Sequence, residues 1–185
     1  MIDFDSIIFY PCLKLIRVSF NIDNISPNSE MRSRRAMKGN RTMVKLKELL
    51  RSKGGEVWYV VPKTSVCVVI QLMAEKGVGA LPVVDETGLV GIISERDMMR
   101  IIAVNKNCLD EEISEYMTRN VITASPETTL EECMQLMIDK HFRHLPVVED
   151  GQLTGIVSIR DVVRVLLDQR DALITDLENY IVGKR

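Results

Sequence analysis

Residues 91–97 read Gly-Ile-Ile-Ser-Glu-Arg-Asp, and residues 155–161 read Gly-Ile-Val-Ser-Ile-Arg-Asp. Both stretches run from an apolar strand pattern into a helix pattern, with a serine at the junction and an aspartate three residues later. A serine at this point can accept a hydrogen bond from a free backbone N–H of the first helical turn. The heptapeptide therefore predicts a strand that leads directly into a capped helix, twice in one chain.

The two heptapeptides belong to a longer internal repeat with an offset of 64 residues. Pro62 aligns with Pro126, and the Leu-Pro-Val-Val run at 81–84 aligns with the same run at 145–148. Over residues 62–100, 17 of 39 positions are identical without a gap, which is far more than chance gives. The chain therefore carries two copies of one structural unit.

Each copy predicts the same order of elements. A short β-rich run, at 57–61 or 121–124, ends at the proline, and Thr64 or Thr128 can then cap an amphipathic helix of about 12 residues. In the second copy, Thr128 and Glu131 have the spacing of a capping box. Two strands joined by a tight turn and a second helix follow, so the predicted unit is β-α-β-β-α.

A unit of about 50 residues buries too little apolar surface to be stable alone. We therefore expect an α+β fold in which two β-α-β-β-α repeats pack together with pseudo-two-fold symmetry. Residues 44–51 look like a lead-in to the first copy that matches the helical stretch at 110–117 before the second. The expected parts are a poorly ordered N-terminal extension at 1–42, a first domain at 43–106, a second domain at 107–170 and a helical tail at 171–185.

Composition and charge exclude several classes of function. With 46% hydrophobic and 27% charged residues the chain is globular, and its apolar start is broken by Pro11, Lys14 and Arg17, too early for a membrane span. A net charge of −2 disfavours a nucleic-acid binder, a role that rests only on the basic stretch 32–47. The four cysteines lack metal or redox spacing. We expect a cytoplasmic location, and organellar targeting by residues 1–42 stays open.

The Leu-Pro-Val-Val strand, the turn and the Gly-x-x-Ser-x-x-Asp junction, present twice, resemble a pair of cystathionine-β-synthase-type (CBS) domains, an arrangement called a Bateman module. The resemblance covers residues 45 to about 170 and is closest to small stand-alone CBS-pair proteins. It implies two clefts between the paired domains, each able to hold an adenine nucleotide such as AMP, ATP or NADH. Some members of the family hold S-adenosylmethionine instead.

The resemblance also implies roles for particular residues. Asp97 and Asp161 would accept hydrogen bonds from ribose hydroxyls, although a plain helix start needs the same serine and aspartate and stays open as an alternative. Arg143 precedes the second Leu-Pro run as a phosphate contact where the first copy has Gly79, which predicts two unequal clefts. Arg96 and Arg160 would donate further hydrogen bonds to a phosphate. The complete set of implied ligand-binding residues is Gly79, Ala80, Ser94, Arg96, Asp97, Met117, Thr118, Ile122, Thr123, Arg143, His144, Leu145, Pro146, Ser158, Arg160 and Asp161.

A heptad pattern in the last predicted helix indicates a partner helix. Spacings of three and four connect Val163, Leu166, Arg170, Leu173, Leu177 and Tyr180, with Arg170 as the one polar interruption. The seam fits a homodimer contact, and packing against the same chain is the alternative that stays open.

The predicted function is a non-enzymatic regulatory module that senses an adenosyl ligand and acts on a protein target that the sequence does not name. The chain shows no nucleophile elbow and no glycine-rich phosphate loop, and no metal or cofactor is required for the predicted role. The alternative is a module for dimerisation and protein interaction that needs no ligand. Which adenosyl ligand binds, and whether one or both clefts fill, stays open.

Overall fold

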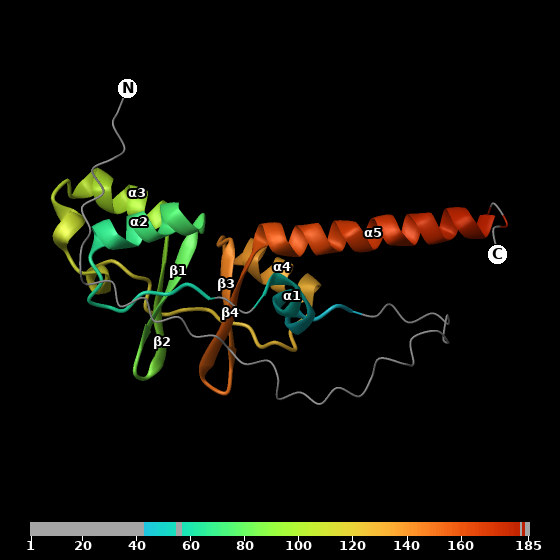
Figure 1. The fold of residues 1–185 in the computed structure, drawn as a ribbon, viewed down its shortest axis with the longest axis horizontal. Helices are drawn as coiled ribbons and strands as arrows, with labels where there is room; N and C mark the ends of the chain where they lie inside the picture. The colour runs from blue at the N-terminus through green and yellow to red at the C-terminus, as the bar shows by residue number, and fades with distance from the viewer. Residues whose placement is uncertain (1–42, 55–56, 182, 184–185) are drawn as a thin grey trace, which may run out of the picture.

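A computed structural model describes residues 43–54, 57–181 and 183, so the extension expected at 1–42 lies outside the described residues. Two antiparallel hairpins stand side by side, each flanked by helices, and a long last helix runs out from the second hairpin (Figure 1). The α+β repeat fold expected from the sequence is thereby confirmed. The elements are α1 (Leu46–Lys53), α2 (Val66–Lys76), β1 (Ala80–Asp85), β2 (Gly88–Ser94), α3 (Glu95–Val104), α4 (Leu130–Asp139), β3 (His144–Glu149), β4 (Gln152–Ser158) and α5 (Ile159–Ile181).

The two hairpins have the same register. Leu81 pairs with Ile93 in the first, and Leu145 pairs with Val157 in the second; all four side chains are fully buried. Each hairpin also has an irregularity between the two valines of its Leu-Pro-Val-Val run. The sequence repeat is therefore a structural repeat down to the pairing of individual residues.

The first β-rich run of each repeat forms one β-bridge in place of the predicted strand. Val60 bridges Val83, and Ala124 bridges Val147, both in parallel orientation. A proline follows almost at once, at position 62 in the first repeat, and proline has no N–H to continue a ladder. The pairing consequently stops after a single bridge.

The helix caps differ by one residue from those expected. The hydroxyl oxygens of Thr64 and Thr128 accept hydrogen bonds at 3.2 Å from the backbone N–H groups of Val61 and Ser125, so they stabilise the turn at the proline. The capping box at α4 is made by Thr129 and Glu132. The predicted Thr128–Glu131 box was wrong because the turn uses the hydroxyl of Thr128 and shifts the helix start.

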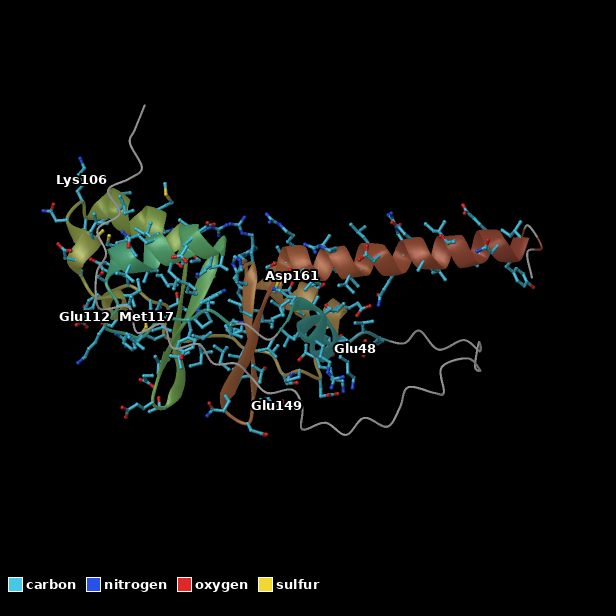
Figure 2. All side chains as sticks on the ribbon, in the orientation of Figure 1. Glu48, Lys106, Glu112, Met117, Glu149 and Asp161 are labelled. Atoms are coloured by element: carbon cyan, nitrogen blue, oxygen red, sulfur yellow. The ribbon has the colours of Figure 1, made fainter. Side chains whose placement is uncertain are left out.

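The lead-in segments are exchanged between the repeats. Leu46 and Leu49 of α1 lie in the core of the second repeat, whereas Ile113 and Met117, which precede the second repeat, lie in the core of the first. Figure 2 shows the same exchange, with Glu48 beside the second repeat and Met117 beside the first hairpin. The packing thus crosses the boundary expected at 106/107, and neither repeat has a complete core without a segment that belongs in sequence to the other.

An ionic contact also fastens α1 to the second repeat. Lys47 Nζ lies 2.7 Å from Glu127 Oε1, and Lys45 pairs with the other oxygen of the same carboxylate. Hydrogen bonds from Lys45 and Lys47 lower the pKa of Glu127 to about 2. The carboxylate therefore stays charged at neutral pH and keeps both lysines in place.

The last helix extends beyond the body of the protein. α5 has 23 residues, and its C-terminal part projects away from both repeats (Figure 1). Leu173, Leu177 and Tyr180 of the predicted heptad seam are exposed, the last of them 87%. Packing of this part against the described residues of the same chain, one of the two alternatives, is therefore not observed. The described residues contain no helix that is both long and apolar enough to cross a membrane.

Candidate functional site

Two clefts lie between the repeats, and each contains one of the Ser-x-x-Asp junctions. The first cleft, of about 260 Å³, contains Ser94 and Asp97 at the start of α3. The second, of about 640 Å³, contains Ser158 and Asp161 where α5 begins (Figure 2). Small-molecule sites in proteins are commonly about 300–1,000 Å³. The second cleft falls within this range, which suits a nucleoside or a mononucleotide, and the first lies just below it.

The serine and aspartate of each junction form a capping box. Ser94 donates to Asp97 Oδ2 through its hydroxyl at 2.6 Å and through its backbone N–H at 3.0 Å. Ser158 makes the same two bonds to Asp161 Oδ2, at 2.7 and 2.9 Å. The helix-start interpretation is confirmed, and the box holds each carboxylate in the wall of its cleft. The ribose contact stays a prediction.

The residues before the two Leu-Pro runs lie in a wall that both clefts share. Gly79, Ala80, Arg143 and His144 line the first cleft and the second alike, because β1 and β3 begin at the contact between the repeats. A Cβ atom on Gly79 would lie 3.0 Å from the imidazole Cε1 of His144. The glycine thus makes room for the histidine of the other repeat. Because Arg143 lines both clefts, it does not make their charges unequal, contrary to the prediction from the sequence.

His144 lies in this shared wall as a largely neutral imidazole. Burial lowers its pKa, and neighbouring Arg143 lowers it further, while the acidic groups of Glu95 and Asp161 act in the opposite direction without prevailing. At neutral pH the ring offers one hydrogen-bond donor and one acceptor. The permanent positive charge of the shared wall therefore comes from Arg143.

Most of the residues implied by the resemblance line a cleft, and three do not. Leu145 is fully buried in the core of the second repeat, and Met117 is buried against Gly91, whose Cβ position lies 2.5 Å from its sulfur. Thr123 is exposed and lines neither cleft as the described residues define them. Those that line the first cleft are Gly79, Ala80, Ser94, Arg96, Asp97, Thr118, Ile122, Arg143, His144 and Pro146. Those that line the second are Gly79, Ala80, Arg143, His144, Ser158, Arg160 and Asp161.

Several cleft residues escaped the sequence interpretation. Phe142 and Asn120 line the first cleft, and Trp58 and Lys53 line the second. Trp58, the single tryptophan, makes a cation–π contact with Lys76, whose ammonium group lies 4.5 Å from the ring centroid. That Trp58 is the single tryptophan of the chain was the one feature of the sequence that could have marked it as a cleft residue. Lys53 gave no signal, because its segment packs on the other repeat.

Lys53 forms an ion pair inside the second cleft. Its Nζ lies 2.7 Å from Asp161 Oδ2 and donates a second hydrogen bond, at 3.3 Å, to the carbonyl of Ile156. Burial opposes the ionisation of Asp161, but hydrogen bonds from Lys53 and Ser158 outweigh it and hold the pKa of Asp161 below its usual value. The second cleft thus contains a charged aspartate whose counterion comes from the protein itself.

Paired hairpin–helix repeats with an anchored aspartate in each of two clefts define a tandem-repeat module with two clefts between its halves. The sequence model of the CBS domain family matches residues 46–104 and 113–168. The chain therefore belongs to the CBS-domain family, with two domains in tandem, and the resemblance stated from the sequence is confirmed.

Relatives of known name support this assignment. The CBS domain-containing protein CBSX3, mitochondrial, of Arabidopsis thaliana is 34% identical over 148 residues, which are 75% of this chain and 72% of that protein. The CBS domain pair of protein MJ0100, solved in complex with 5'-methylthioadenosine and S-adenosyl-L-methionine, is 28% identical with a TM-score of 0.62. CBSX2, solved in complex with AMP, is 30% identical with a TM-score of 0.57. The similarity covers 69% and 68% of this chain, respectively, and 98% of each solved chain.

Proposed function

We propose that the protein is a non-enzymatic regulatory module that binds an adenosyl ligand, AMP, ATP, NADH or S-adenosylmethionine, between its two repeats. The observation that carries the proposal is the pair of clefts, each with a capping-box aspartate held in its wall and both bordered by Arg143. Two similar CBS pairs have been solved with AMP or with S-adenosylmethionine and methylthioadenosine. These ligands share an adenosine group, so the ribose and the base are the parts to be recognised.

The lining of the first cleft offers a partner for each part of such a ligand. Asp97 is an acceptor for ribose hydroxyls, and the guanidinium groups of Arg96 and Arg143 are donors for a phosphate. Ile122 and Phe142 supply apolar surface for the base. Since these residues come from both repeats, a bound ligand would connect the repeats. It would act as a signal only if it binds two states of the module with different affinity.

A thermal-shift series with AMP, ATP, NADH and S-adenosylmethionine tests the proposal. A ligand at a hundred times its Kd stabilises the folded state by about 2.7 kcal/mol, so we expect a clear rise in melting temperature with at least one of the four. Guanosine at the same concentration is the control for nonspecific effects. No shift with any adenosyl ligand would refute the proposal and favour the alternative, a dimerisation module that needs no ligand.

We further propose that the protein forms a homodimer through α5. The exposed seam of Leu173 and Leu177 supports this proposal, as does the charge pattern, because residues 159–170 carry three arginines and two aspartates whereas 171–181 carry only acidic charges. Two antiparallel copies would place the acidic half of each helix beside the more basic half of the other. The partner is thus a second copy of the chain.

Leu173→Glu combined with Leu177→Glu should convert the dimer to a monomer, because charged carboxylates would replace the apolar side chains that pack in the seam. Sedimentation velocity measures the change. Ala172→Glu adds a charge on the other side of the same helix and should leave the dimer intact. If the double variant sediments as the wild-type protein does, another surface forms any dimer that exists.

The cellular location and the regulated target remain predictions. A cytoplasmic location is the expectation from the sequence, and the name of the Arabidopsis relative, mitochondrial, supports testing residues 1–42 as a targeting segment. The protein target is expected to bind a surface that changes when the clefts fill.

A further inference from the structure

We infer that Lys53 is an internal competitor for the ligand in the second cleft, so that the first cleft fills at lower ligand concentration. The inference rests on the proposed function, because it concerns the order in which two adenosyl sites fill. It assigns to α1 a direct role in binding, although α1 lies outside both hairpin–helix units.

The contacts of Asp161 show what a ligand would meet. Its Oδ2 atom accepts three hydrogen bonds, two from Ser158 and one from Lys53 Nζ at 2.7 Å. The side chain of Asp161 is 16% exposed and that of Lys53 is 39% exposed, so the pair lies at the wall of the cleft, where a ligand would bind. A ribose that hydrogen-bonds to this carboxylate must share it with an ammonium group or displace that group.

The other repeat provides an internal comparison. Lys45 bridges Thr129 and Glu112 bridges Ser65, so the exchanged lead-in segments correspond with an offset of 67 residues. The backbone hydrogen bonds of Leu46 and Ile113 to the two repeats follow the same offset. By residue count on this register Asn120 corresponds to Lys53, although α1 continues as a helix to Lys53 whereas Thr118 forms a bridge with Ile92.

Among the described residues that line the first cleft there is no lysine. Asn120 lines that cleft, and it is neutral. Among the described residues no lysine pairs with Asp97, whose nearest cation is the exposed guanidinium of Arg100, 3.7 Å from Oδ1. Within the part of the chain that the structure describes, Asp97 Oδ2 accepts hydrogen bonds only from the side chain and the backbone N–H of Ser94. The pair with Arg100 uses the other oxygen, Oδ1, and is long and exposed, so a ribose can reach Oδ2 of Asp97 without displacing a cation from that atom.

A ligand without charge isolates this competition. A phosphate could attract Lys53 away from Asp161 and conceal the cost of breaking the pair, whereas adenosine offers only its ribose and base. Loss of a partly exposed ion pair should therefore tighten adenosine binding in the second cleft by about three- to tenfold.

The experiment compares Lys53→Met with Lys47→Met. Lys47 lies on the same helix, is 38% exposed and also pairs with a carboxylate at 2.7 Å, but it lies outside both clefts. Each change is made in the Asp97→Asn background, which weakens the first cleft while keeping an acceptor for Ser94. Isothermal titration with adenosine then reports mainly on the second cleft.

We expect Lys53→Met to tighten adenosine binding by about three- to tenfold and Lys47→Met to leave it unchanged. In the reciprocal test, Asn120→Lys in the otherwise unchanged protein should weaken binding in the first cleft. Unchanged or weaker binding in the Lys53→Met protein would overturn the inference and leave the proposed function in place. Failure of the unsubstituted protein and all variants to bind adenosine, AMP or S-adenosylmethionine would overturn the proposed function and the inference together.

Discussion

Replacing Leu46 with alanine is expected to destabilise the second repeat by about 2–5 kcal/mol, although Leu46 precedes the first repeat in the chain. Its side chain is fully buried in the core formed by residues of α4, α5, β3 and β4. The backbone N–H of Leu46 also donates to the carbonyl of Thr128 at 2.9 Å, which holds the helix in place while the side chain is shortened. A cavity would remain where the isobutyl group now packs.

Urea denaturation measures the loss of stability, and native-state hydrogen exchange shows where it occurs. Protection should fall first in β3 and β4 and not in β1 and β2. Met99→Ala, at an exposed position of α3, is the matched control and should change the free energy of unfolding little. A loss of protection confined to the first repeat would contradict the exchanged packing of α1.

Replacing Asp97 with alanine is expected to weaken AMP binding by about tenfold to 150-fold. The carboxylate is held at the wall of the first cleft by Ser94, and a charge-assisted hydrogen bond to a ribose hydroxyl contributes about 1.5–3 kcal/mol. Removing the carboxylate removes this contribution. Isothermal titration measures the affinity directly and is insensitive to a modest loss of helix stability as long as the protein stays folded.

Glu86→Ala is the control for this change, because Glu86 is an exposed acidic residue of the same repeat in the turn between β1 and β2, away from the cleft. It should bind AMP as the unsubstituted protein does. Equal affinity of the Asp97→Ala and Glu86→Ala proteins would mean that Asp97 serves only as a helix cap.

Local chemistry explains which features could be predicted. The hairpins follow from two short apolar runs joined by a tight turn, and the helix starts at Ser94 and Ser158 follow from side chains that satisfy backbone groups three residues away. The caps of the other two helices were misplaced by one residue. Two neighbouring hydroxyl residues compete there for the same role, Thr64 and Ser65 at α2 and Thr128 and Thr129 at α4, and only the turn at the proline decides between them.

The candidate site was less accessible to prediction. Arg143 and Gly79 differ in sequence and so predicted clefts of unequal charge, yet they line one shared wall. Met117 resembled a ligand-lining residue, but it fills the space beside Gly91 in the core of the first repeat. Both errors arise because residues that are far apart in the chain lie side by side in the structure, and the sequence does not show which of them meet.

The sequence by itself determined the repeat, the order of most elements and the two Ser-x-x-Asp junctions, since these depend on interactions between residues close in the chain. Only the tertiary structure decided that the lead-in segments change places, that both clefts share Arg143 and that Lys53 pairs with Asp161. The physical reason is that small units bury their apolar surface wherever a complementary segment can reach, and chain order sets no rule for that choice. The ion pair that sets Asp161 apart from Asp97 follows from that exchange.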